Sequence, residues 1–412
     1  MRRLTMKFLA TAAVAGLVTM VGTGAVAATR NPNAGVQPAP LTGEGEGLKL
    51  IKNIPTASGT DMEFATIKGR EYGFVAARTT ANHPNGGLYV IDVTKPEQAK
   101  VAGYLPCNMT QMDIQISHDK KTVIMAADGA GGPDSCLMVG QLGFMTVDIS
   151  NPKKPKAIGV AAIPRGSHNT TAHPTKPYVY NSDSDVGNPR GEIQVWSIKN
   201  PAKPELVNTV RALGHSPHDI AFNSKGTQAV TAGVDNIELY DTSDPENPTI
   251  QATFQCPGCS ITHDAKFTPD DAGLVIGDEG GGGGTYPCPG GALYFYELQQ
   301  GIVPVLTGIY EPNELVVAQE GQTTPGACTS HVFDFDQDGS HLAISWYTAG
   351  TRYLDITNPV GVTFGAQGTG VVEAGWFIPD GANSWSSKIH KGPYVYSNDI
   401  NRGFDIYKIV AK

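Results

Sequence analysis

The chain contains 412 residues, of which 40% are hydrophobic, 17% are charged and 8% are aromatic. This hydrophobic share is enough to form a core, which excludes a chain that is disordered throughout. The 49 glycines and 29 prolines favour a structure with many tight turns over a helical bundle. The formal net charge is −9 and no long block of Lys and Arg follows the N-terminus, so we do not expect a protein that binds nucleic acid.

The N-terminus has the three parts of a secretory signal peptide. Arg2, Arg3 and Lys7 form a positive region, an apolar run extends over residues 8–21, and residues 25–27 (Ala-Val-Ala) match an A-x-A cleavage site. A membrane anchor is the alternative, but the uninterrupted apolar run is short for a span of about 20 residues and no other segment approaches one. We therefore expect an exported chain, secreted or extracytoplasmic, with no membrane span after the signal is cleaved.

We expect three segments along the chain: a signal peptide at residues 1–27, a flexible lead-in at residues 28–47, and one folded domain at residues 48–412. The lead-in is rich in proline and glycine, with Pro32, Pro38 and Pro40 among its residues.

One sequence motif recurs through the predicted domain. A small residue precedes an alternating apolar run, which ends in a polar or aromatic residue and a turn that usually contains proline. Clear copies begin at Gly87, Gly143, Gly191 and Asn236, and weaker copies begin at Gly291, Gly350 and Arg402. Two short β-type runs precede each copy and one follows it, so each unit contains four short antiparallel strands. Four-stranded units that repeat every ~50 residues are typical of a β-propeller.

The seventh copy of the motif ends the chain, so no fourth strand can follow it. Residues 48–55 at the other end of the domain have the apolar pattern of the missing strand. Pairing the two ends in one blade would remove exposed sheet edges. We therefore predict an all-β fold: a seven-bladed β-propeller of four-stranded antiparallel blades whose ring is closed by pairing the N- and C-terminal strands.

These repeats resemble those of the LVIVD-repeat family. The segments YVIDVTKP (residues 89–96), MTVDISNP (145–152) and YLDITNP (353–359) carry the resemblance, and residues 385–407 are similar to exported bacterial members of that group. The resemblance covers residues 48–412 and implies a propeller and an exported location. It implies no catalytic residues, because the family is defined largely by its repeats.

Four histidines occupy one position in the repeat. When the blades are aligned on their first strand, the same place at its start is taken by His168, His218, His263 and His331 in four consecutive blades. The first strand of a propeller blade lines the axial channel, so these side chains would converge at one mouth of the channel. Neutral imidazole is a ligand for Zn, Cu, Fe and Ni. We predict that the four histidines bind one transition-metal ion (Cu, Fe or Zn); the alternative is four separate polar caps that hydrogen-bond neighbouring loops.

The loops expected at this mouth carry several acids. The loop that enters the first strand and the loop between the second and third strands share one face, because the first two strands are antiparallel. Asp183, Asp278 and Glu279 follow second strands and are candidates to orient the imidazoles or to act as acid or base. Asp219 and Asp264 directly follow two of the histidines, and they either orient an imidazole or face outward through strand alternation.

All six cysteines also map to these loops: Cys107, Cys136, Cys256, Cys259, Cys288 and Cys328. Disulfides are the default in an exported chain. We expect Cys107 to pair with Cys136, since this bond joins the two same-face loops of one blade, and we next expect Cys288 to pair with Cys256, Cys259 or Cys328. The spacing of Cys256 and Cys259 also matches a redox pair or a zinc knuckle, although no companion CxxC is present.

Two functions are compatible with these patterns. The first is a metal-dependent enzyme, an oxidoreductase or a lyase acting on an unknown small molecule, by analogy with other seven-bladed propellers that hold metal on axial histidines: the carotenoid-cleavage oxygenases (iron) and the methanethiol-oxidase group (copper). The second is a non-catalytic propeller whose disulfide-stapled loop face binds a protein, a glycan or an envelope component. We expect a monomer in either case, and the metal content of the purified protein distinguishes the two.

Overall fold

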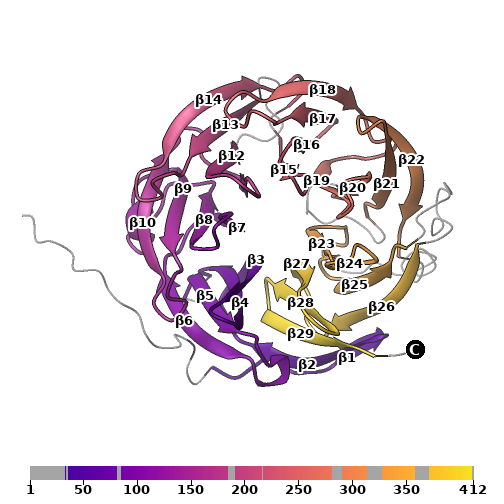
Figure 1. The fold of residues 1–412 in the computed structure, drawn as a ribbon. Coiled ribbons are helices and arrows are strands. Elements are labelled where there is room, and N and C mark those ends of the chain that lie inside the picture. Colours follow the sequence, from indigo (N-terminus) through magenta and orange to yellow (C-terminus); the bar gives the residue numbers. More distant parts are fainter. Residues whose placement is uncertain are drawn as a thin grey trace, which may run out of the picture.

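Seven antiparallel sheets stand around a central axis like the blades of a propeller (Figure 1). The computed structural model describes Asn33 and residues 36–80, 85–183, 191–215, 217–280, 290–312, 327–357 and 371–410. The prediction of an all-β, seven-bladed propeller is confirmed. The expected signal peptide at residues 1–27 lies outside the described residues. In the described part of the chain, no helix is long and apolar enough to cross a membrane.

Within each blade the strands follow the chain from the axis outward. The first three blades contain β3 (Ser58–Ile67), β4 (Arg70–Arg78), β5 (Gly87–Asp92) and β6 (Lys100–Pro106); β7 (Gln111–Ile116), β8 (Thr122–Ala127), β9 (Gly143–Asp148) and β10 (Lys156–Ala162); and β11 (Asn169–Ala172), β12 (Tyr178–Ser182), β13 (Glu192–Ser197) and β14 (Glu205–Arg211). Two short 3-10 helices lie in the connections, η1 (Pro96–Gln98) and η2 (Cys136–Met138).

The remaining blades repeat the pattern. Blades four to seven contain β15 (Asp219–Phe222), β16 (Gln228–Gly233), β17 (Asn236–Asp241) and β18 (Thr249–Phe254); β19 (Thr262–Phe267), β20 (Gly273–Asp278), β21 (Leu293–Gln299) and β22 (Val303–Tyr310); β23 (Phe333–Phe335), β24 (His341–Ser345), β25 (Thr351–Asp355) and β26 (Val372–Pro379); and β27 (Ser384–Ile389), β28 (Tyr394–Asp399) and β29 (Gly403–Ile409).

The N-terminal strand closes the ring as predicted. β2 (Leu48–Ile54) is the outermost strand of blade seven and pairs antiparallel with β29, with Leu48 opposite Ile409 and Ile54 opposite Phe404. This pairing covers the edge of β29 and joins the two ends of the domain in one sheet (Figure 1).

The residues expected to form a lead-in contribute a strand of their own. β1 (Gly43–Glu46) pairs with β26 and gives blade six a fifth strand. The sequence of β1, Gly-Glu-Gly-Glu, carries no apolar alternation. The glycine at position 45 lets the backbone lie against the ring of Phe377, which an added Cβ would approach to 2.4 Å.

Steric contacts explain why the repeat motif begins with a glycine in two of its copies. Gly143, at the start of β9, has φ +124° and an added Cβ would lie 2.0 Å from the carbonyl oxygen of Ala161 on the next strand. Gly291, just before β21, has φ +69° and an added Cβ would lie 1.8 Å from the carbonyl oxygen of Asp278. Only glycine accommodates both the backbone conformation and the close approach.

The core lies between neighbouring blades. Phe74 and Leu88 of blade one pack with Ile114 and Met125 of blade two in a single buried cluster. The alternating apolar residues that predict the strands therefore face the adjacent blade.

Candidate metal centre at the mouth of the channel

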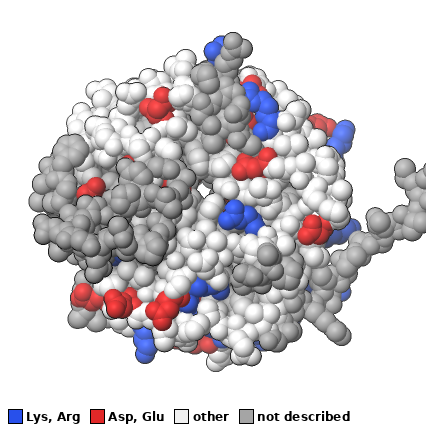
Figure 2. All heavy atoms as spheres, turned by 180° about the vertical axis from the view of Figure 1, so that it is seen from behind, with Lys and Arg blue, Asp and Glu red and all other residues white. Residues whose placement is uncertain are grey.

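The four predicted histidines lie side by side at the inner starts of blades three to six. His168 precedes β11, His218 precedes β15, His263 is the second residue of β19, and His331 lies two residues before β23. Successive ring centroids are 4.2, 3.9 and 4.2 Å apart from His168 to His331. Residues 45 to 68 apart in the sequence thus form one continuous arc around the axis. The face at which these strands start, hereafter the mouth, has a hollow at its centre (Figure 2).

Local backbone irregularities direct side chains into the mouth. A β-bulge between Thr262 and Asp264 leaves His263 without a partner in the β19–β20 ladder. Bulges of this kind commonly change the direction of a side chain beside a functional site. Tyr347 has φ +42°, an uncommon backbone conformation for an aromatic residue, and its bridge to Ser384 of the next blade holds it there.

The outer two histidines are oriented through Nδ1. The Nδ1–H of His331 donates to the backbone carbonyl of Trp385 at 2.6 Å. Nδ1 of His168 lies 3.1 Å from the Asp128 carboxylate, which accepts its proton. A hydrogen bond at Nδ1 fixes the tautomer whose Nε2 carries a lone pair, which is the common arrangement of histidine ligands in metal sites.

The inner two histidines have no such partners. Nδ1 of His218 and Nδ1 of His263 are buried and make no hydrogen bond within the described residues. Nε2 of His218 lies only 2.7 Å from Nε2 of His168. A bound cation would allow both Nε2 atoms to point at it as lone-pair donors, so the donor set fits a metal ion.

Burial keeps three of these imidazoles neutral. Desolvation, together with the nearby imidazoles, lowers the pKa of His218 and His263 well below the usual value. Desolvation also lowers the pKa of His331 to about 3. Neutral imidazole is the form that ligates a metal ion.

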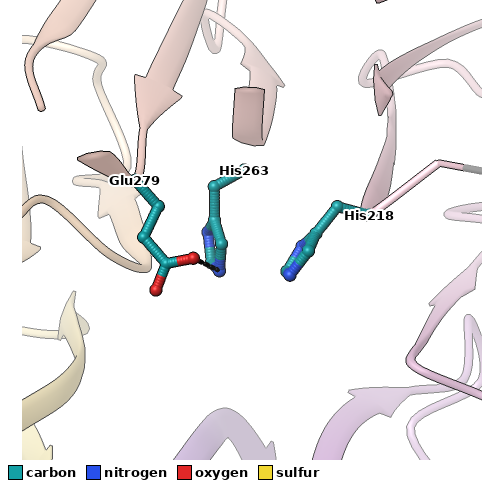
Figure 3. Close-up of side chains that lie close together, drawn as sticks. All are labelled: His218, His263 and Glu279. Carbon is teal, nitrogen blue, oxygen red and sulfur yellow. Dashed lines mark ion pairs between the residues drawn. The ribbon is translucent and has the colours of Figure 1, made fainter. Parts of the chain in front are cut away.

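Glu279 is part of the same cluster. Its carboxylate lies 3.7 Å from Nε2 of His263 and 3.7 Å from Nε2 of His331, and it accepts a hydrogen bond from the Tyr347 hydroxyl at 2.7 Å. Potential ligand atoms of His218, His263 and Glu279 all lie within 4.8 Å of one another (Figure 3). Burial raises the pKa of Glu279 to about 7, against the lowering effect of the Tyr347 hydrogen bond.

The other two predicted acids have a structural role in the loops. Asp278 accepts hydrogen bonds from the backbone N–H groups of Ser260 and Ile261, both at 2.9 Å. Asp183 forms an ion pair of 3.1 Å with Arg165. Both carboxylates therefore anchor the loop that enters a first strand, whereas Glu279 reaches the histidines.

Three further residues contact the histidines: Asp128, an acid that the sequence already places in a loop of the mouth, and two aromatic residues, Tyr347 and Trp385, that the repeat does not assign to the site. Asp128 directly follows β8, as Asp183 directly follows β12, and Asp278 is the last residue of β20. Tyr347 and Trp385 pack against His331 with ring centroids 4.7 and 4.5 Å away. Nothing in the repeat pattern marks Tyr347, because its position depends on the loop that follows β24.

A polar cavity of about 220 Å³ lies on the axis beside the histidines, with His263 in its wall. Asp219 lines it, so this residue faces the axis and not outward. Lys388 pairs with Glu63 at 2.7 Å and Lys266 with Asp264 at 3.2 Å. The innermost strands therefore place charged side chains around the channel.

The disulfides tie down the loops of the mouth. Cys107 is bonded to Cys136, as expected from the sequence. Cys256 is bonded to Cys259, which removes both as partners for Cys288. Cys288 lies outside the described residues.

Comparisons with known proteins identify the fold. No protein-family model matches the chain, and no curated protein matches it. Similar solved structures include the β-propeller domain of Cps50 (Swd1) from Myceliophteria thermophila (TM-score 0.61, 11% identity, 88% of this chain and 100% of that chain) and hydrazine synthase from Kuenenia stuttgartiensis (TM-score 0.61, 12% identity, 88% and 98%). A functionally unknown protein from Desulfotomaculum acetoxidans is also similar (TM-score 0.54, 16% identity, 77% and 89%). At these identities the likeness concerns the propeller alone.

Proposed function

We propose that this chain is an exported, LVIVD-type propeller that holds one transition-metal ion on the histidines of its mouth and works as a metal-dependent oxidoreductase or lyase. The observation that carries the proposal is the arc of four adjacent imidazoles, in which the buried Nδ1 atoms of His218 and His263 have no hydrogen-bond partner among the described residues. Four buried imidazoles in one register are a costly arrangement for a purely structural role.

The residues around the proposed ion have separable roles. His218 and His263 are the central ligands, and His168 and His331 flank them, each with a lone pair on Nε2 that can ligate the ion. Asp128 and the Trp385 carbonyl hold the two outer rings in place. Glu279 is either a carboxylate ligand or the group that holds a proton beside the ion, since its carboxylate lies within 3.7 Å of two imidazoles.

Imidazole and carboxylate donors suit Zn, Cu or Fe. Such an ion, when bound, supplies Lewis-acid or redox chemistry. The repeat segments and the signal-like N-terminus support the assignment to exported LVIVD-type propellers, and the two disulfides agree with an oxidising compartment.

Elemental analysis of the protein exported by its native host tests the proposal. We expect about one transition-metal ion per chain, and we expect the double variant His218→Ala, His263→Ala to lose it. His215→Ala is a matched control, because His215 is a partly exposed loop residue whose Nδ1 bonds Asp235. Circular dichroism and thermal unfolding should show that the double variant keeps its fold. A wild-type chain without transition metal, or a folded double variant with undiminished metal, would contradict the proposal.

A further inference from the structure

Arg78, the last residue of β4, lies at the mouth beside the histidine arc. Its guanidinium sits over the ring of Trp385, 5.0 Å from the ring centroid. Trp385 in turn packs against His331 and accepts the hydrogen bond from Nδ1 of that histidine. The guanidinium is therefore one aromatic ring away from a proposed metal ligand.

Arg78 differs from the other arginines that the structure describes. Four of these form ion pairs with an acidic side chain: Arg70, Arg165, Arg352 and Arg402. The fifth, Arg211, is exposed to solvent. Arg78 is half-buried, and no carboxylate among the described residues lies within ion-pair distance of it. Burying a charged guanidinium costs free energy unless an acidic side chain pairs with it. The other buried or partly buried arginines have such a partner, and among the described residues Arg78 has none.

The surroundings of Arg78 favour a ligand with one negative charge. Burial lowers the pKa of its guanidinium, and Asp128 and Tyr347 act on it only at longer range. The Asp128 carboxylate is already bonded to His168. Glu279, which accepts the Tyr347 hydrogen bond and lies 3.7 Å from His331, is a second acid at this end of the arc, so two carboxylates would repel a ligand with additional negative charge. Basic and acidic atoms indeed flank the central hollow of this face (Figure 2).

We propose that Arg78 binds the carboxylate of a monoanionic substrate and holds it beside the metal; this inference rests on the proposed metal function. The guanidinium presents parallel N–H donors that match the two oxygens of a carboxylate. Its cation–π contact with Trp385 holds the guanidinium at this place before the ligand arrives. The substrate class is thus an organic acid whose reacting atoms reach the histidine arc.

Ligand-observed NMR with acetate, and with acetamide as its neutral isostere, tests the inference on the protein as exported by its native host, whose metal content is measured in the same sample. We expect acetate to bind and acetamide not to bind. Arg78→Gln should weaken acetate binding by about tenfold or more, as expected for loss of a charge-assisted hydrogen-bonded pair. Arg78→Lys should retain part of the affinity, and Arg211→Gln should bind acetate like the wild type. Thermal unfolding of each variant verifies that it is folded.

The outcomes separate this inference from the proposed function. The inference is supported if Arg78→Gln keeps the metal content of the wild type and loses acetate binding. Acetate binding that is equal in wild type and folded Arg78→Gln places acetate elsewhere and overturns it, as does a wild type that does not bind acetate. If the protein holds no metal but binds acetate through Arg78, the metal proposal fails and the anion site stands.

Discussion

His173 is a buried histidine that belongs to the hydrogen-bonding framework and not to the mouth. Its Nε2–H donates to the carbonyl of Gly226 at 3.0 Å, and its Nδ1 accepts from the backbone N–H groups of Thr175 and Lys176, both at 3.2 Å. Both nitrogens are thus engaged in a pattern that only the neutral ring can satisfy. Burial lowers the pKa of His173 to about 4.

This histidine should make the protein less stable in acid. The folded-state pKa lies below the unfolded value of about 6.5, so the unfolded chain takes up the proton first as the pH falls. The stabilisation is fully present above pH ~6.5 and should be lost toward pH ~4, by at most about 1.4 kcal/mol per pH unit. Urea unfolding at pH 7 and pH 5 measures the effect. His173→Gln should show a smaller loss between the two pH values, and an equal loss in both proteins would refute the role.

The residues of the site differ in how well sequence alone locates them. The histidines follow from the register of the repeat, because every first strand begins at the same place around the axis. Tyr347 and Arg78 do not, because their contacts arise where loops and strand ends of different blades meet. Glu279 and Asp278 are neighbours in sequence, and only the fold distinguishes the carboxylate that reaches the imidazoles from the one that caps backbone N–H groups.

At the scale of elements, the two described disulfides close loops of very different size. Cys107–Cys136 joins residues 29 apart, across the loops on either side of blade two's inner strands, whereas Cys256–Cys259 joins residues 3 apart within one loop. Cross-linking distant residues removes more conformational entropy from the unfolded chain, by about 3–4 kcal/mol for the first and about 2 kcal/mol for the second.

Removing the first disulfide should therefore destabilise the fold more. We expect Cys107→Ala, Cys136→Ala to lower the free energy of unfolding by more than Cys256→Ala, Cys259→Ala does. Urea unfolding monitored by circular dichroism measures both, with the wild type as reference. The reverse order would show that strain or loop packing, and not the size of the closed loop, decides the stabilisation.

Strands were predictable where an apolar run recurs from one repeat unit to the next, as in β9 and β17, which are buried along almost their whole length. β1 was not, because alternating glycine and glutamate resemble a turn-rich linker and the strand forms only through contact with β26. The bond between Cys256 and Cys259 likewise depends on a tight turn that brings their Cα atoms to 5.4 Å.

For the whole molecule, the pairing of β2 with β29 holds the ring together. A chain that begins at residue 55 lacks both β1 and β2 and leaves the backbone edge of β29 unpaired, whereas a chain that begins at residue 28 keeps both strands. We expect the shorter chain to unfold at lower temperature and to associate through the open edge. Thermal unfolding and light scattering of the two chains provide the test. A shorter chain that is monomeric and equally stable would mean that six complete blades need no closure.

The same pairing sets the order in which the molecule can be completed. A ribosome delivers Leu48–Ile54 before the first six blades and Gly403–Ile409 after them, and each of these strands is the partner of the other. Blade seven therefore cannot be completed until Gly403–Ile409 has been synthesised, and a polypeptide truncated before this strand leaves β2 without its partner.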